Sequence, residues 1–247
     1  MTEITSPLSL LVRRLAARSA LATDDQEALE RLPYQFRTYE RGSYILRDGD
    51  PRRSYCSVVS TGLAYRHKIT LNGLRQIIGL VLAGEPLDFQ QLLLNRYDHS
   101  IQAATNVEVI ELDRDNLAKI IFDRAEVGKA IWTDALITAS ISNEWIVNVG
   151  RRNAKSRVAH FFCEFFARSN GMKLKAGARF MLPMTQEQIG DVTGLTSVHV
   201  NRMIRTSIND SVIEYERPFI TVINHERLCH IAGFDPLYLH DAQLVPS

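Results

Sequence analysis

The stretch LPMTQEQIGDVTGLTSVHVNRMIRTSINDSVIEYERPFITVIN, residues 182–224, predicts two short helices, a tight turn and a β-hairpin. Thr185 can cap the first helix, because Gln188 follows three residues later as in a capping box. Gly194 permits a sharp left-handed turn, and Thr196 can then cap the second helix. In that second helix the apolar residues recur every four positions and are expected to face the core: Val200, Ile204 and Ile208.

The other face of this second helix is short, polar and cationic, as expected of a helix that enters the DNA major groove. It carries Ser197, Val198, His199, Asn201, Arg202 and Arg205. Residues 212–215 and 219–222, joined across 216–218, predict the two strands of a small wing. Two caps, a turn glycine and a wing together favour a winged helix-turn-helix over a chance match to a bare helix-turn-helix pattern.

The charge of the chain is balanced overall but uneven along its length. The 247 residues carry a formal net charge of +1. Between residues 151 and 205, however, ten Lys and Arg residues face only three Asp and Glu residues. Positive charge gathered beside a helix-turn-helix indicates nucleic-acid binding, whereas a merely solvated basic face is the simpler alternative.

Membrane and disulfide features are both unexpected in this sequence. No stretch approaches the ~20 apolar residues that span a bilayer, and the N-terminus lacks the pattern of a signal peptide. The three cysteines, Cys56, Cys163 and Cys229, lie far apart and form no C-x-x-C motif. This usage predicts reduced thiols in the cytoplasm and no zinc site, and we expect no cofactor.

The middle of the chain has the texture of a β-domain. Short β-prone runs from residue 34 to residue 113 alternate with turn signals about every ten residues, which predicts an antiparallel sandwich or barrel. Helices are expected on both sides of it, at 8–18, at 24–32 with Thr23 as its cap, and after a cap at Asp115. A helical insert is expected at 88–94.

A long helix is predicted from about residue 125 to residue 149, followed by another at 153–171. The long helix has two apolar stripes with coiled-coil spacing, which suggests that one packs within the chain and the other on a second subunit. One stripe is Ile131, Ala135, Thr138, Ser142, Trp145 and Val149; the other is Trp132, Leu136, Ala139, Asn143 and Ile146. The expected domains are 1–124, the helix 125–150, and 151–247.

This order of elements resembles the Crp/Fnr family of bacterial transcription regulators. The most specific matches are residues 182–204, the segment GRRNAKSRVAHFFCE at 150–164 and the segment GEPLDFQQLLLNRYDHSIQA at 84–103. The resemblance implies an α+β chain with an antiparallel, cyclic-nucleotide-binding-like β-roll, a long dimerisation helix and a C-terminal winged helix-turn-helix. It also implies a homodimer that binds a palindromic operator in double-stranded DNA and contacts RNA polymerase, with no membrane partner.

The sequence departs from the family where effectors bind. In cyclic-AMP-binding members a Gly-Glu pair is followed by an Arg-Ser or Arg-Thr pair, and the arginine holds the cyclic phosphate. Here the corresponding pocket residues are Gly84, Glu85, His99 and Ser100, with Arg96 nearby. A neutral imidazole is a poor substitute for a guanidinium at a phosphate. Residues 1–30 contain no cysteine, which argues against the iron–sulfur centre of the oxygen-sensing branch.

The resemblance also assigns the residues that would contact DNA. Base contacts fall on Val198, His199 and Arg202, where Val198 offers only an apolar surface and Arg202 can fork onto guanine. Contacts to phosphates are expected from Thr185, Gln186, Ser197, Arg205 and Arg217. The alternatives are an ion pair of Arg202 with Asp191 or Glu187, and packing of Val198 on the wing.

Two other classes of function remain as alternatives. A cupin-like metal enzyme would need paired His and a Glu, but His67 and His99 form no such motif. A degenerate helix-turn-helix could instead serve protein contacts, which the local positive charge disfavours. His67 or His99 as a haem ligand, and Cys56 or Cys163 as a redox switch, are weaker readings than ordinary buried residues. We therefore predict a DNA-binding regulator and not an enzyme.

Overall fold

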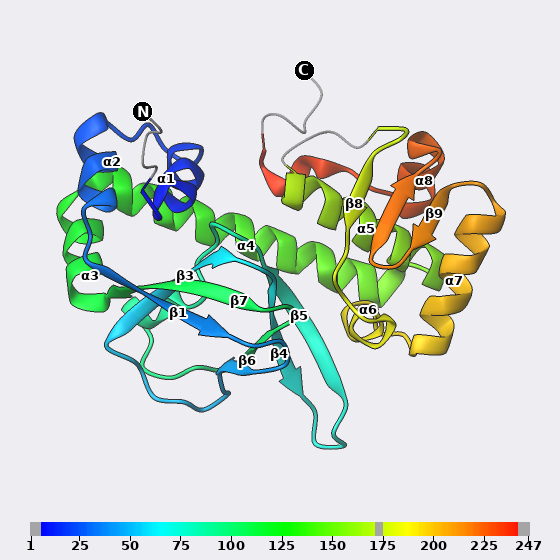
Figure 1. Ribbon diagram of the computed structural model, residues 1–247, viewed down its shortest axis with the longest axis horizontal. Helices are drawn as coiled ribbons and strands as arrows, with labels where there is room; N and C mark the ends of the chain where they lie inside the picture. The colour runs from blue at the N-terminus through cyan, green and yellow to red at the C-terminus, as the bar shows by residue number, and fades with distance from the viewer. Residues whose placement is uncertain (1–5, 171–174, 242–247) are drawn as a thin grey trace. The chain divides into compact units, whose positions relative to one another are not determined.

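The computed structural model describes residues 6–170 and 175–241 (Figure 1). By its internal contacts the chain divides into two compact units. The first comprises residues up to Lys68 together with Gly79–Leu136, and the second comprises Ile69–Ile78 together with the residues from Ile137 onward. This division differs from the expected domains, because the long helix contributes residues to both units.

Two antiparallel sheets form the first unit, except that residues Ile69–Ile78 of the second sheet belong to the second unit. One has the strand order β1-β7-β3 and the other β2-β6-β4-β5. The strands are β1 (Tyr34–Tyr39), β2 (Tyr44–Leu46), β3 (Tyr55–Thr61), β4 (Ala64–Ile69), β5 (Arg75–Val81), β6 (Ser100–Ala103) and β7 (Val107–Asp113). Val59 and Val109 from the first sheet share one core with Ile101 and Val81 from the second. This arrangement confirms the predicted antiparallel β-roll.

Helices cover the outer face of the β1-β7-β3 sheet. They are α1 (Ser9–Ala16), α2 (Thr23–Glu30) and α3 (Arg114–Asp123). Leu11, Val12 and Leu15 of α1 are buried, and they pack in one cluster with Ile110 and Leu112 of β7. Strands β3 and β7 therefore carry buried apolar residues on both faces, toward the second sheet and toward the helices, whereas β1 is mostly exposed.

Two of the predicted caps in this unit are wrong. Thr23 is the first helical residue of α2, and its N-cap position is Ala22, which offers no side-chain acceptor. Asp113, not Asp115, caps α3, because its carboxylate accepts the N–H of Asn116 at 2.9 Å. The expected insert at 88–94 is a single 3₁₀ turn, η1 (Phe89–Leu92).

The long helix α4 (Ala125–Arg151) was predicted to within two residues. Its buried side differs from the first stripe drawn from the sequence. Among those stripe residues Trp145 is buried and Ile131 and Val149 are partly buried, whereas Ala135, Thr138 and Ser142 are exposed. The buried side instead runs through Val127, Ala130, Asp134, Ile137, Trp145 and Asn148. A search for apolar spacing misses this side because Asp134 and Asn148 are polar.

The second unit consists of helices and one small sheet. Its further elements are α5 (Ala154–Asn170), β8 (Arg179–Met181), α6 (Gln186–Thr193), α7 (Ser197–Asn209), β9 (Ile213–Glu216), β10 (Phe219–Val222), α8 (His225–Ala232) and η2 (Pro236–Leu239). Gly171, the expected end of α5, lies outside the described residues. The wing is a three-stranded antiparallel sheet, β8-β10-β9, and the sequence did not predict the three-residue strand β8.

The end of α7 departs from the predicted apolar spacing. Val200 and Ile204 are buried as expected, but Ile208 is 37% exposed and Ser207 takes the buried position. Ser211 follows the helix with a positive φ of 54°. Its N–H donates to the Ile208 carbonyl, and the N–H of Val212 donates to the Ser207 carbonyl, which is the bond pattern of a Schellman motif.

In the described part of the chain, no helix is long and apolar enough to cross a membrane.

Candidate DNA-binding surface and effector pocket

The helix-turn-helix is fixed by its two caps and its turn. Thr185 accepts the N–H of Gln188 at 3.1 Å while the Gln188 side chain accepts the N–H of Thr185 at 2.9 Å, so the predicted capping box is present. Thr196 caps α7 by accepting the N–H of His199. Gly194 between the helices has a φ of 66°, in the left-handed region.

Gly190 is a second requirement of the turn, and the sequence analysis did not single it out. A Cβ at this position would lie 2.4 Å from the carbonyl oxygen of Leu195. The backbone N–H of Leu195 also donates to the Gly190 carbonyl, at 3.0 Å. The chain after α6 therefore passes directly over Gly190. Only a residue without a side chain allows α7 to begin at this distance from α6.

The N-terminal part of α7 presents its predicted base-reading residues to solvent. Val198, His199 and Arg202 are all exposed, and the Val198 residue keeps 75% of its accessible surface. Val198 therefore does not pack against the wing, which removes the alternative reading of this residue. The His199 ring is oriented by its own cap, because Nδ1 lies 3.1 Å from the hydroxyl of Thr196.

The arginines of α7 are not held by acidic neighbours. Asp191 and Glu187, the two expected alternatives for Arg202, instead pair with Arg75 within the second unit, at 2.7 and 3.7 Å. Neither Arg202 nor Arg205 forms an ion pair within residues 6–170 and 175–241. Both guanidinium groups are therefore available to a ligand on this face of the helix.

The predicted phosphate contacts lie at the ends of elements. Ser197 is the first residue of α7 and is exposed, and Arg217 is exposed between β9 and β10. Thr185 and Gln186 lie at the start of α6. The Gln186 side chain accepts the Asn201 amide N–H at 3.2 Å, which joins the two helices of the motif through polar side chains.

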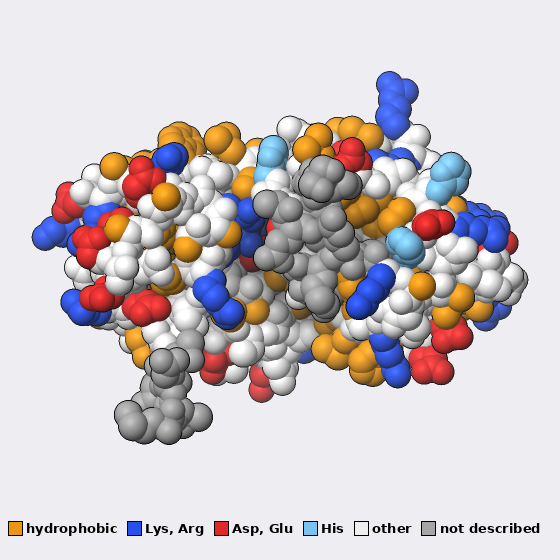
Figure 2. Space-filling view, turned by 90° about the horizontal axis from the view of Figure 1, so that it is seen from above, with side chains coloured by type: hydrophobic (Ala, Val, Ile, Leu, Met, Phe, Trp, Pro, Cys, Tyr) orange, Lys and Arg blue, Asp and Glu red, His pale blue; other side chains and the backbone are white. Residues whose placement is uncertain are grey.

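The wing is stabilised from its own strands. Arg179 of β8 lies over the ring of Phe219 of β10, 4.5 Å from the centroid, and pairs with Glu216 of β9 at 3.6 Å. The face of the molecule shown in Figure 2 carries Lys and Arg side chains dispersed among acidic and apolar ones.

The predicted effector residues are already engaged by the chain itself. Glu85, which would hold a ribose, accepts Nη1 of Arg14 from α1 at 3.0 Å and the N–H of Leu82 at 3.1 Å. Leu10 of α1 lies against Gly84, where a Cβ would be 3.1 Å from the Leu10 side chain. Helix α1 thus covers Gly84 and Glu85, the first two residues of the expected effector pocket.

His99 and Ser100 form the second half of this pocket. His99 is buried, and its Nδ1 lies 2.8 Å from the carboxylate of the exposed Asp98. Burial lowers the pKa of His99, and the hydrogen bond to His99 lowers the pKa of Asp98. Ser100 accepts the N–H of Asp48 at 3.0 Å, and Arg96 is exposed with its guanidinium 3.3 Å from the Gly49 carbonyl.

These residues do not fit a cyclic nucleotide. The Asp98 carboxylate beside His99 repels a phosphate, a neutral imidazole offers no positive charge to hold one, and the carboxylate of Glu85 is already paired with a guanidinium. A cation that the sequence analysis missed, Arg66 of β4, lies close enough to lower the pKa of His99. It is fixed by donating to the carbonyls of Pro86 and Leu87 at 2.8 and 3.1 Å.

The buried carboxylate of Asp88 lies three residues after Glu85 and is hydrogen-bonded to neighbouring segments. Asp88 accepts the N–H of Ser57 at 2.6 Å and the side-chain amide of Gln91 at 2.9 Å. Burial raises the pKa of Asp88 to about 7. The described residues contain no group of three His, Cys, Asp or Glu side chains that could hold a metal ion.

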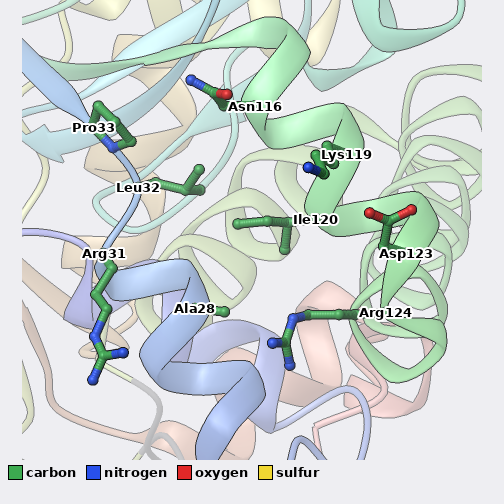
Figure 3. A pocket seen from close by; sticks show the side chains of 9 residues that line it. All are labelled: Ala28, Arg31, Leu32, Pro33, Asn116, Lys119, Ile120, Asp123 and Arg124. Atoms are coloured by element: carbon green, nitrogen blue, oxygen red, sulfur yellow. The ribbon is translucent and has the colours of Figure 1, made fainter.

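A surface hollow lies elsewhere in the first unit, between the end of α2 and α3 (Figure 3). Leu32 and Ile120 point toward one another across it, and Lys119 borders it. None of the residues predicted for the effector pocket or for DNA contact lines this hollow.

The predicted dimer residues of α4 fall into two groups. Trp132, Leu136 and Ile146 are exposed, at 67%, 64% and 67%. Trp145 is buried against α5, where its indole N–H donates to Glu164 and its ring meets the Phe161 ring edge-on. Ile131 and Val149 are partly buried.

Two protein families match this chain, in the order of its units. Residues 36–124 match the cyclic nucleotide-binding domain, and residues 156–231 match the Crp-like helix-turn-helix domain. The transcriptional activator protein FnrL of Cereibacter sphaeroides is 26% identical over 228 residues, which cover 91% of this chain and 90% of that protein. The transcriptional activatory protein AadR of Rhodopseudomonas palustris is 28% identical over 229 residues, covering 92% and 90%.

The structure of FixK2 from Bradyrhizobium japonicum has the same fold, with a TM-score of 0.74 at 24% identity over 83% of this chain and 100% of that one. The β-roll, the long helix and the winged helix-turn-helix define a two-domain transcription regulator with a helix-turn-helix DNA-binding domain. The chain belongs to the Crp/Fnr family of bacterial transcription regulators.

Proposed function

We propose that the protein is a cytoplasmic homodimer that reads a two-fold symmetric DNA operator with α7 and contacts RNA polymerase, without cyclic AMP as its effector. The observation that carries the proposal is the exposed, unpaired face of α7. Its arginines have no acidic partner among the described residues, and its caps fix the N-terminal turn that would enter the major groove.

Within that groove the three base-reading residues have different chemistry. Arg202 can donate two hydrogen bonds to O6 and N7 of a guanine. His199 can donate to a purine N7, while Val198 offers an apolar surface to a thymine methyl group. We therefore infer that each half-site contains at least one guanine contacted by Arg202 and one thymine next to Val198.

The surrounding polar groups position the helix on the backbone. Thr185 and Gln186 on α6 and Ser197 on α7 lie at helix starts, where N–H groups favour a phosphate. Arg205 on α7 and Arg217 between β9 and β10 add exposed positive charge. These contacts supply affinity that is independent of sequence and weakens as salt increases.

Two copies of α7 require a dimer, and the exposed apolar side of α4 is the surface that we assign to it. Trp132, Leu136 and Ile146 follow coiled-coil spacing, with Ala135 and Ala139 between them. Burying a large apolar side chain stabilises an assembly by about 1.5–3 kcal/mol. Trp145 is engaged within its own chain and is therefore not part of this proposed interface.

The test is the selection of binding sites from random double-stranded DNA with the purified full chain. We expect an enriched sequence with two inverted half-sites whose centres lie about one helical turn, or ~10 base pairs, apart. In the sequences selected by Arg202→Ala, the preference at one base pair of each half-site should be relaxed, whereas Arg31→Ala, which changes an exposed arginine of the first unit, should select the same sequence as the unchanged protein. Enrichment of no sequence, or of a motif without inverted symmetry, would contradict the proposal.

A further inference from the structure

The last four backbone carbonyls of α6 all accept hydrogen bonds, and the donors come from the turn, from α5 and from β5. Regular helical bonding supplies no partner to these carbonyls, so each needs a donor from another segment. The Gly190 carbonyl accepts the N–H groups of Gly194 and Leu195 in the turn. The Thr193 carbonyl accepts Nη1 of Arg157 from α5 at 3.2 Å. The two carbonyls between them are served by the β4–β5 hairpin.

Two consecutive residues of β5 hold the C-terminal end of α6. Nε2 of Gln76 lies 2.6 Å from the carbonyl oxygen of Asp191 and 3.3 Å from that of Val192. Arg75, the preceding residue, places its Nε 2.7 Å from the Asp191 carboxylate and its Nη2 3.7 Å from that of Glu187. The hairpin therefore contacts both the backbone and the side chain of Asp191.

This contact comes from a part of the chain that is distant from the helix-turn-helix in sequence. Arg75 lies 116 positions before Asp191. It begins β5, which is an edge strand of its sheet and so has no neighbouring strand on its outer side. The side chains of Arg75 and Asp191 keep only 25% and 19% of their accessible surface. Their ion pair is therefore better shielded from water than a fully exposed pair would be.

The contact leaves the DNA-reading face of the motif open. It lies at the C-terminal end of α6, whereas Thr185 and Gln186, the proposed phosphate contacts, lie at the start of that helix. Val198 and Arg202 on α7 are exposed while Gln76 holds α6. The arrangement that the hairpin stabilises is thus one in which the helix-turn-helix is free to meet DNA.

We propose that Arg75 and Gln76 are positioning residues for DNA binding, which hold α6 in the arrangement that lets α7 enter the major groove. The apparent affinity of a protein falls with the fraction of molecules in the binding-competent arrangement. Loss of the contact would lower that fraction in the free protein. A contact that only stabilised the fold would leave the affinity of the folded protein unchanged. The inference rests on DNA binding by the helix-turn-helix and does not depend on which residues read the bases.

The first test removes the Gln76 amide without changing the charge. In Gln76→Met the new side chain has a similar length and cannot donate a hydrogen bond, and attraction to phosphates is unaffected. Fluorescence anisotropy of the full chain with its selected operator should give a dissociation constant about three- to tenfold higher, the range of one neutral hydrogen bond. Gln102→Met is the matched control. The Gln102 amide donates to the Gly42 carbonyl at 2.7 Å within the first unit, so its loss should leave the operator affinity unchanged.

The second test reverses the ion pair between Arg75 and Asp191. Asp191→Arg adds positive charge beside the helix-turn-helix, which by its charge alone would strengthen binding to DNA. We expect it to weaken binding, because two guanidinium groups then face each other. Arg75→Asp should also weaken binding. The double variant Arg75→Asp/Asp191→Arg restores opposite charges and should bind the operator more tightly than either single variant.

Thermal melts followed by circular dichroism show whether each variant is folded at the temperature of the binding assay. An unaltered operator affinity in folded Gln76→Met would overturn the proposal. Tighter binding by Asp191→Arg would also overturn it, since the charge and not the position of α6 would then set the affinity. If Gln76→Met does not fold, the three variants of the ion pair decide alone. Failure of the unchanged protein to bind any DNA would instead contradict the DNA-binding function, and this inference with it.

Discussion

The indole N–H of Trp145 on α4 points at the carboxylate of Glu164 on α5, with Nε1 2.9 and 3.0 Å from its two oxygens. Tyr238 donates to the same carboxylate at 2.9 Å, and Arg168 donates at 3.2 Å. Glu164 is buried, so these donors replace the water that a charged carboxylate would otherwise bind. Trp145 is therefore both a hydrogen-bond donor to Glu164 and part of the apolar core of the second unit.

Replacing Trp145 with Phe should destabilise the second unit. The change keeps an aromatic ring but removes one donor from a buried carboxylate, at a cost of about 1–3 kcal/mol. The urea midpoint of unfolding, followed by circular dichroism, measures this loss. Phe122→Leu is the control, because Phe122 on α3 is 67% exposed and lies outside the proposed interface, so its change should stay within about 0.5 kcal/mol. Equal midpoints for both variants would contradict the assignment.

Replacing Trp132 with Arg should split the dimer and leave the subunit folded. An arginine without a partner is costly at a buried interface, by several kcal/mol, but is harmless on a solvent-exposed helix face. Sedimentation equilibrium of the purified variant should give a monomer that binds a full operator no better than a half-site. Phe122→Arg is the control, since Phe122 on α3 is also 67% exposed, and it should remain dimeric. A dimeric Trp132→Arg protein would place the interface elsewhere.

Arg202 and Arg205 should differ in what they contribute to DNA binding. Arg202→Ala should weaken binding to the selected operator by about 1–3 kcal/mol and relax the preference at one base pair of each half-site. Arg205→Ala should weaken binding to all sequences alike and flatten the dependence on salt. Fluorescence anisotropy with the operator and single-base variants measures both. If both variants lose affinity equally for all DNA sequences, Arg202 contacts a phosphate and not a base.

Cyclic AMP should not stabilise the protein. A ligand at a hundred times its dissociation constant stabilises a fold by about 2.7 kcal/mol. With Glu85 engaged by Arg14, and His99 facing Asp98, we expect no rise in the melting temperature at millimolar cyclic AMP. Thermal scans with AMP as the control nucleotide measure this. A rise with cyclic AMP but not with AMP would show that the pocket binds the nucleotide after all.

Replacing Ser211 with Gly should stabilise the second unit by about 0.5–1 kcal/mol. Ser211 has a φ of 54°, a conformation that glycine adopts without the steric cost of a Cβ. The gain is limited because glycine also makes the unfolded chain more flexible. Chemical unfolding measures the change, and Ser211→Ala, which keeps the Cβ, should give no such gain. A destabilised Ser211→Gly protein would show that the Ser211 side chain contributes more to stability than its left-handed backbone conformation costs.

Local features of the sequence predicted the helix-turn-helix well. Thr185, Gln188, Gly194 and Thr196 each act within a few residues of their own position, so the sequence contains both members of every interaction. The β-roll was predicted for the same reason, because its turn glycines have positive φ at the expected places. The base-reading and dimer assignments are not of this kind and stay predictions.

Features that join distant segments were beyond the sequence. The contact of Arg14 with Glu85 spans 71 positions, and that of Trp145 with Glu164 depends on how two helices cross. The buried side of α4 was misread because Asp134 occupies a core position, where the charges of Arg14 and Arg18 balance its carboxylate. Spacing rules count apolar residues and cannot recognise a buried carboxylate whose counter-charges come from another helix.

Helix α1 and the turn that follows it supply positive charge to the interior of the first unit. Arg14 reaches Glu85 at 3.0 Å and Asp134 at 2.9 Å, and Arg18 reaches Asp134 at 3.3 Å. Removing one partner of a buried ion pair costs about 3–5 kcal/mol. A fragment that begins after α1 would therefore retain every strand of the β-roll. It would lack the Arg14 guanidinium that balances the carboxylates of Glu85 and Asp134. Ligand screens on such a fragment would find cations that replace Arg14, and not the effector of the intact chain.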